Sequence, residues 1–241
     1  MNRSQLELEP GLILDARRAV WLEHERALLV SDLHLGYVWT HRHGGQMLPV
    51  GIPDDTLARL ALLVSEYRPE QLILLGDILH GDTPVEAVLS ELQQLIAGLG
   101  QQTRLRLIEG NHDVGLKRAL HRLGSDLPVE LGFMLGPHAL LHGHLPTRLQ
   151  APAYLAAATE RRGRLIFGHE HPAVSLSDGI ASRARCPCFI VADSALVLPC
   201  FTTWSTGGGG GEPFSPLGQA LLNRRLIAIV AGKLLPLSPS R

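Results

Sequence analysis

The chain has 241 residues, a length that fits one large domain or two small ones and buries a sizeable core in either case. Apolar residues make up 45% of the chain and charged residues 19%, which excludes a mostly disordered protein. The formal net charge is -1 at pH 7, so the chain is not a globally basic nucleic-acid binder. A local basic patch remains compatible with this balance.

The sequence shows no sign of a membrane segment or a disulfide framework. No apolar run approaches the roughly 20 residues that span a bilayer, and Glu7 and Glu9 stand where a signal peptide would have an apolar core. The three cysteines, Cys186, Cys188 and Cys200, are an odd number, which is typical of free thiols in a reducing compartment. These features predict a cytoplasmic protein that does not associate with membranes.

Short apolar runs alternate with helical patterns in the first half of the chain. The runs at residues 27–31, 71–75 and 104–108 predict buried strands. Two stretches between them repeat apolar residues at helical spacing. One begins at residue 53, and the other covers residues 84–98. A strand–helix–strand–helix–strand series implies parallel strands joined by right-handed crossovers, and therefore an α/β fold.

The second half of the chain is rich in predicted strands and poor in helix. A helix is expected over residues 151–161, and a leucine- and proline-rich tail at residues 234–239 is expected to be exposed, which leaves a homo-oligomer or a protein partner open. No internal repeat or linker divides the chain, so we expect one domain over residues 1–241. The predicted strands cover residues 133–135, 138–141, 164–167, 188–192, 195–198 and 226–230.

Five short polar motifs follow the ends of predicted strands. Any one of them is weak evidence, since Gly-Asp is ordinary turn chemistry and core histidines are common. Together they place oxygen and imidazole donors past the carboxyl ends of several strands, where open α/β sheets bind their ligands. The motifs are Asp32-Leu33-His34, Gly76-Asp77, Gly110-Asn111-His112-Asp113, His142-Gly143-His144 and Gly168-His169-Glu170-His171.

The donor types in these motifs indicate a site for divalent metal ions. Mixed oxygen and imidazole donors suit Mn, Fe, Zn, Co or Ni. Two divalent ions about 3.5–4 Å apart can hold a bridging hydroxide and bind both the attacking and the leaving oxygen of a phosphoryl group. Such a pair needs a carboxylate between the ions, and Asp77 is the candidate.

Over about residues 27–172 the motifs resemble, in order, those of the calcineurin-like metallophosphoesterase superfamily. The resemblance implies an α/β fold, a four-layer double β-sandwich flanked by helices, and a cofactor of two divalent metal ions, with Mn²⁺ the first expectation. It also implies the ligands. The first metal would be bound by Asp32, His34, Asp77 and His171, and the second by Asp77, Asn111, His142 and His169.

The resemblance further implies roles for residues beside the metals. His112 would be the general acid that protonates the leaving alkoxide, or would stabilise the transition-state charge, and Asp113 would orient it by accepting its other ring proton. His80 is a candidate contact to substrate phosphate. Arg42 lies in an expected loop at residues 41–43, near enough to the first motif to reach substrate. A solvated side chain remains the alternative for both.

A narrower resemblance covers nearly the whole chain. The residues that carry it are similar to the ligase-associated DNA-damage-response phosphodiesterases, which implies a phosphodiesterase and nuclease in DNA repair, with DNA or RNA as substrate and DNA-repair proteins as partners. His142-Gly143-His144 is closer to the general superfamily pattern than to this subfamily. The residues that carry the resemblance are 31–36, 45–51, 75–80, 168–173, 185–189 and 198–201.

Other functions of the same fold stay open at this point. A phosphomonoesterase or a nucleotide or cyclic-nucleotide phosphodiesterase would use the same metal motifs. A non-catalytic scaffold is also conceivable, although the full donor set and His112 argue for an enzyme. Aromatic residues make up 5% of the chain, and the sequence shows no aromatic platform on which single strands would stack.

Overall fold

The structure is a computed structural model, and it describes residues 4–43, 45, 55–81, 86–144, 147–177, 179, 183–204 and 212–237. The predicted helix starts at residues 53 and 84 and most of the 45–51 segment lie outside the described residues.

The first sheet has seven strands in chain order, and its second half is parallel. Strands β1 to β4 form an antiparallel meander, and β4 to β7 pair in parallel through crossover segments that carry the helices. The strands are β1 (Gln5–Glu9), β2 (Leu12–Asp15), β3 (Ala19–Leu22), β4 (Ala27–Val30), β5 (Gln71–Leu75), β6 (Arg104–Ile108) and β7 (Val129–Glu130).

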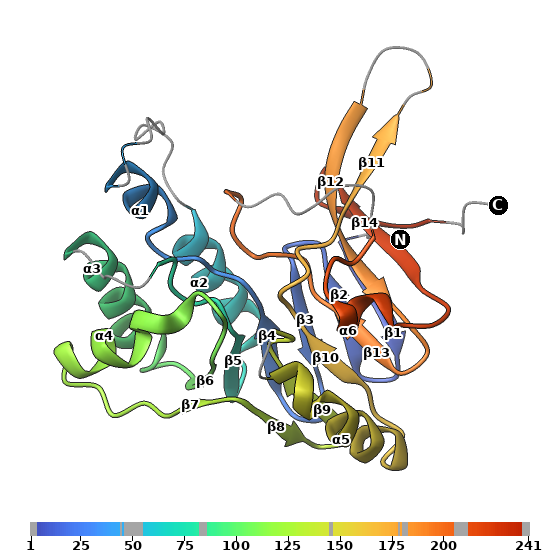
Figure 1. Cartoon of the computed structure of the whole chain (residues 1–241), viewed down its shortest axis with the longest axis horizontal. Coiled ribbons are helices and arrows are strands. Elements are labelled where there is room, and N and C mark those ends of the chain that lie inside the picture. Colours follow the sequence, from blue (N-terminus) through green and yellow to red (C-terminus); the bar gives the residue numbers. More distant parts are fainter. Residues whose placement is uncertain are drawn as a thin grey trace.

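Helices cover one face of this sheet, as Figure 1 shows. Helices α1 and α2 follow β4, α3 and a π-helical turn follow β5, and a 3₁₀ turn with α4 follows β6. Their bounds are α1 (Tyr37–His43), α2 (Thr56–Tyr67), α3 (Glu86–Gln94), the π-helical turn (Leu95–Leu99), the 3₁₀ turn (Asp113–Gly115) and α4 (Leu116–Arg122).

The second sheet runs in the order β15-β14-β12-β13-β10-β9-β8, and β11 pairs with β12 as a hairpin that projects from the body of the molecule (Figure 1). Only β9, β10 and β13 are parallel. The elements are β8 (Gly132–Leu135), β9 (His138–Leu141), α5 (Thr147–Glu160), β10 (Leu165–Phe167), β11 (Ala173–Ser177), β12 (Arg183–Val191), β13 (Ala195–Val197), α6 (Pro216–Gln219), β14 (Arg225–Val230) and β15 (Lys233–Pro236).

Three apolar clusters join these elements into four layers. One packs α2, α3 and α4 against the first sheet, a second lies between the two sheets, and a third packs α5 against the second sheet. Strand β4 is buried along its whole length and β5 along all but its first residue, because helices cover one face and the other sheet covers the other. This arrangement confirms the predicted α/β fold with a four-layer double β-sandwich.

The sequence predicted β5, β6 and β9 to the residue, but one expectation was wrong. Residues 41–43 belong to the helix α1 and are not a loop. The described part of the expected exposed tail includes residues of the edge strand β15, where Leu235 and Pro236 are exposed as expected and Leu234 is buried. Three strands before residue 23 were not anticipated. None of the helices among the described residues has the length and apolar composition needed to cross a membrane.

Candidate metal centre

The five polar motifs lie at the carboxyl ends of β4, β5, β6, β9 and β10, so loops from both sheets meet at one site. Backbone hydrogen bonds tie neighbouring loops together: the His34 amide donates to the Asp77 carbonyl (2.9 Å), and the Gly168 amide donates to the His142 carbonyl (3.1 Å). The His169 amide donates to the Asp32 carboxylate (3.2 Å) and links the two sheets. The predicted residues are therefore brought to one place.

Five of the candidate ligands have left-handed backbone conformations. Such a conformation costs a non-glycine residue on the order of 1–3 kcal/mol and persists only where surrounding contacts impose it, which is common at functional sites. The loops are held in this shape by the hydrogen bonds between them. The residues are Asp32 (φ 58°), His34 (49°), Asp77 (50°), His169 (68°) and His171 (42°).

The first cluster consists of Asp32, His34, Asp77 and His171, whose ligand atoms all lie within 4.8 Å of one another. The Nε2 atoms of His34 and His171 are 3.3 Å apart, and His171 Nε2 is 3.2 Å from Asp32 Oδ1. Asp77 Oδ2 is 3.9 Å from His34 Nε2. Two carboxylates and two imidazoles thus converge on one point, as the ligands of a divalent transition metal do.

The second cluster consists of Asp77, His142 and His169, and its ligand atoms meet the same distance limit. His142 Nε2 lies 3.4 Å from Asp77 Oδ1 and 3.3 Å from Asn111 Oδ1. The rings of His142 and His169 have centroids 5.0 Å apart. Asp77 is common to both clusters, with Oδ2 near His34 of the first and Oδ1 near His142 of the second.

Burial and the neighbouring charges shift the pKa values of the imidazoles and carboxylates in the clusters. Burial lowers the pKa of His34 to about 3 and that of His169 to about 4. Burial acts in the same direction on His142 and His171, but the carboxylates beside them outweigh it and raise their pKa values to about 9 and about 11. The buried carboxyl of Asp77 has a lowered pKa, because the imidazoles outweigh its desolvation. A divalent cation needs neutral imidazoles, so it would displace these protons on binding.

Hydrogen bonds outside the clusters orient the donors. The Leu75 carbonyl can only accept, so the 2.7 Å contact places a proton on His142 Nδ1 and leaves Nε2 facing the second cluster. Ser31 Oγ donates to Asp32 Oδ2 (2.7 Å), and the His112 amide donates to Asp77 Oδ1 (2.8 Å). These contacts hold the donor atoms in place.

The glycines of three motifs make room for ligands that come from other motifs. A Cβ on Gly76 would lie 2.4 Å from His142 Nδ1. One on Gly110 would lie 2.2 Å from both the amide nitrogen and Oδ1 of Asp77, and one on Gly168 would lie 2.7 Å from Asp32 Oδ2 and 1.6 Å from the Ser31 Oγ that binds it. The motifs therefore need glycine because the loops approach each other so closely.

We expect Gly110→Ala to lower metal content and to cut turnover by about 10–100-fold, the range seen when groups that support metal ligands are removed. The added methyl group would push the Asp77 carboxylate out of both clusters. Metal content per chain, measured by plasma mass spectrometry after dialysis, checks this. Gly98→Ala is the matched control, because its Cβ meets nothing within 4 Å. Equal metal content in the two variants would contradict the interpretation.

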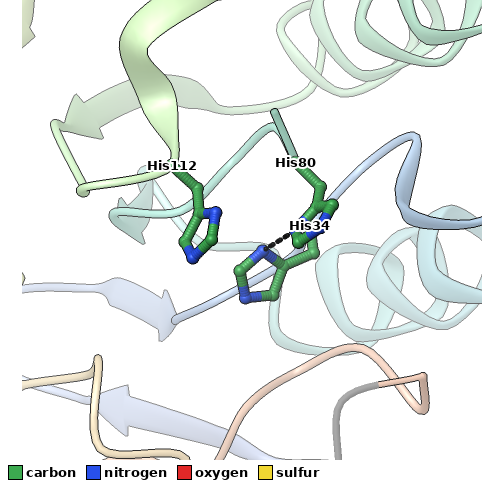
Figure 2. Close-up of side chains that lie close together, drawn as sticks. All are labelled: His34, His80 and His112. Atoms are coloured by element: carbon green, nitrogen blue, oxygen red, sulfur yellow. Dashed lines mark hydrogen bonds between the residues drawn. The ribbon is translucent and has the colours of Figure 1, made fainter. Parts of the chain in front are cut away.

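His112, His80 and His34 lie together at the edge of the first cluster (Figure 2). His80 Nδ1 is 3.2 Å from His34 Nδ1, and the His80 and His112 rings are stacked with centroids 4.9 Å apart. The His112 and His34 centroids are 5.1 Å apart. His144 is buried, with its ring centroid 5.1 Å from that of His142. Arg42, in contrast, lies over the Trp39 ring on α1, at 5.9 Å from its centroid.

The contacts of Asp113 run to two backbone amides, and its predicted role toward the His112 ring stays a prediction. Its Oδ1 accepts from the Leu79 amide and its Oδ2 from the Gly110 amide, each at 2.9 Å, and the described contacts include no hydrogen bond to the His112 ring. Burial, helped by the charge of Asp77, raises the pKa of Asp113 to about 7. Asp113 therefore ties the loop after β5 to the loop after β6 and positions the backbone that carries His112.

Two residues beside the clusters were not anticipated as part of the site. The Cys200 thiol lies within 4.8 Å of the ligand atoms of His34 and His171 and donates to the Asp32 carbonyl (3.1 Å); burial raises its pKa. Phe214 places its ring centroid 5.0 Å from that of His169. Only the position of Cys200, in the 198–201 segment similar to known relatives, offered a signal. All three cysteines are unpaired, as expected.

The two packed sheets thus bring together two clusters of histidine and carboxylate side chains that share one aspartate, a donor set suited to divalent metal ions. The family described as calcineurin-like phosphoesterase matches residues 25–173, well over half of the sequence, and the chain belongs to this family. The five motifs all lie within the matched range. No curated protein matches the chain in sequence.

Solved structures resemble the chain to different degrees. A nuclease MPE from Pseudomonas putida shares 29% sequence identity with a TM-score of 0.66, covering 97% of this chain and 98% of that one. The phosphoesterase Yfce from E. coli is 15% identical, with a TM-score of 0.40 and coverage of 89% and 99%. A Vps29 single mutant from Entamoeba histolytica is 12% identical, with a TM-score of 0.35 and coverage of 88% and 96%.

Proposed function

We propose that the protein is a dinuclear metal-dependent phosphodiesterase that hydrolyses nucleic acid. The observation that carries the dinuclear centre is the position of Asp77, which turns one carboxylate oxygen toward each cluster. Asp32, His34, Asp77 and His171 would hold the first ion, and Asp77, Asn111, His142 and His169 the second. The mixture of oxygen and imidazole donors suits Mn, Fe, Zn, Co or Ni without a strict preference, and Mn²⁺ is the ion that we propose first.

When bound, two divalent cations supply a hydroxide nucleophile at neutral pH and neutralise charge on the phosphoryl group. Side chains of the protein would supply the proton transfer and the contacts to substrate. His112 lies beside the first cluster, with its amide fixed to Asp77, and its ring would protonate the leaving oxygen or stabilise the charge that develops there. His80 stacks on His112, and a contact from His80 to substrate phosphate is part of the proposal.

The similarity to the Pseudomonas putida nuclease supports a nucleic-acid substrate, because it extends over nearly the whole of both chains. The metal ligands themselves do not select a diester over a monoester. A role in DNA repair with partners from that process, a homo-oligomeric state and a cytoplasmic location remain predictions from the sequence.

A comparison of two chromogenic substrates tests the reaction class. We expect bis-p-nitrophenyl phosphate to be hydrolysed faster than p-nitrophenyl phosphate in the presence of Mn²⁺, and a chelator to abolish both reactions. Faster hydrolysis of the monoester would replace the proposal with a phosphomonoesterase. Absence of turnover in a protein that holds two ions would point to a scaffold. If the diester is preferred, defined DNA and RNA strands then separate nucleic-acid cleavage from nucleotide hydrolysis.

A further inference from the structure

Phe214 is a large apolar side chain that stands 55% exposed beside the candidate metal centre. Its ring centroid lies 5.0 Å from that of His169, and the two rings are inclined at 58°. Single exposed apolar residues are common and usually need no explanation. Phe214 differs because its ring lies beside a candidate ligand of the second cluster while more than half of the side chain stays open to solvent.

The backbone of Phe214 is held by a buried carboxylate from the same motif that carries His169. Glu170 is 3% exposed, and its Oε2 accepts hydrogen bonds from the amides of Phe214 (2.8 Å) and Ser215 (3.2 Å). Its Oε1 accepts from Ser215 Oγ. Both oxygens of this buried carboxylate therefore bind residues 214 and 215 and hold the backbone that carries the Phe214 ring.

The segment after Phe214 is packed closely as well. Ser215 caps α6, its Oγ accepting from the Gly218 amide (3.1 Å). A Cβ on Gly218 would lie 2.4 Å from Pro213 Cβ and 2.7 Å from Glu170 Oε1. The backbone that carries the Phe214 ring is thus fixed by hydrogen bonds to Glu170 and by close packing around Gly218.

An exposed ring of this kind fits a flat aromatic ligand. A phenylalanine left 55% exposed keeps apolar surface in contact with water. Stacking on a nucleobase would bury part of that surface when substrate binds. A phosphate held by the two clusters would place the adjoining nucleoside within reach of a ring that touches one of the ligands.

With His112 as the proposed proton donor, its position indicates which of the two nucleosides would meet Phe214. His112 lies against His34 of the first cluster, whereas Phe214 lies against His169 of the second. The leaving oxygen is the one that receives the proton, so it belongs on the side of His112. We propose that Phe214 is a base-binding residue that stacks on the nucleobase of the nucleoside that keeps the phosphate, an inference that rests on the proposed phosphodiesterase function.

Two diesters with the same leaving group test this inference. Thymidine 5′-(p-nitrophenyl phosphate) carries a base on the retained side, and ethyl p-nitrophenyl phosphate does not. The Mn²⁺-loaded wild type is expected to have a lower KM for the thymidine ester. In Phe214→Ala, the KM of the ethyl ester divided by the KM of the thymidine ester should fall by about 5–150-fold, the equivalent of one stacked base. Phe214→Trp should restore the ratio, and Leu222→Ala, at a side chain that is 73% exposed, should not change it.

The ratio of KM values remaining at the wild-type value in Phe214→Ala would overturn the inference. A failure of the proposed function looks different, because the wild type would then hydrolyse neither ester. In that case calorimetric titration of the Mn²⁺-loaded protein with thymidine 5′-monophosphate and with ethyl phosphate decides. Weaker binding of the nucleotide alone in Phe214→Ala supports base stacking, and an equal change for both ligands rejects it.

Discussion

Asp77→Asn should lose metal and activity together. The amide keeps the size of the side chain and one oxygen, so it can still accept from the His112 amide, but it supplies no negative charge and only one oxygen for two ions. Removal of groups that merely support metal ligands costs about 10–100-fold in affinity or activity. Loss of a carboxylate shared by both ions should exceed that, and turnover at saturating Mn²⁺ should fall beyond this range.

Metal stoichiometry and turnover measured on the same preparations check this expectation. Asp126→Asn is a suitable control, because it removes one carboxylate from the exposed segment before β7. Circular dichroism of both variants confirms that the fold is intact. If Asp77→Asn kept two ions at full occupancy, Asp77 would not bridge them, and the proposed dinuclear arrangement would have to be abandoned.

His112→Ala should show the opposite pattern, with near-normal metal content and turnover reduced by about 10²–10⁴-fold, the range for a general acid or base. Metal content should be retained because the contact from position 112 to Asp77 is made by the backbone amide, which alanine also has. The loss should be greater for a substrate that releases a nucleoside alkoxide than for one that releases p-nitrophenolate, since the latter departs without needing a proton.

His121→Ala provides the matched control for this substitution, since His121 is an exposed histidine in the last turn of α4. Steady-state rates with the two kinds of leaving group, together with metal analysis, give the result. A marked loss of metal in His112→Ala would mean that His112 supports the centre and does not transfer a proton. Equal losses for both leaving groups would also argue against proton donation.

The places of the candidate ligands in the fold were predictable because they follow from local patterns. Buried strands such as β4 and β5 stand out as apolar runs, and parallel pairing brings the donors at their ends, Asp32 and Asp77, to the same edge. Of the missed strands before residue 23, β1 does alternate leucine with polar residues over Gln5–Glu9, a strand pattern that was overlooked. Strands β2 and β3 are only four residues long and gave no comparable signal. Strand β15 was not predicted as a strand, because its pairing with β14 is a contact that the local sequence pattern does not reveal.

The contacts that the sequence did not reveal are those between residues far apart in the chain. Asp113 was expected to bind the ring of its neighbour His112, yet its carboxylate reaches the Leu79 amide 34 residues away. Glu170 similarly binds the Phe214 amide, 44 residues away. Backbone amides carry no sequence signature, and so neither partner could be recognised before the loops were seen in place.

The origin of the donors in two different sheets has a consequence for how the molecule holds together. Asp32, Asp77 and Asn111 follow strands of the first sheet, whereas His142 and His169 follow strands of the second. Ions bound by both sets would fasten the two halves of the sandwich at their common rim, as a covalent cross-link does. With metal bound, the two sheets would then unfold together as one cooperative unit. Without metal, they would separate at the apolar cluster that lies between them.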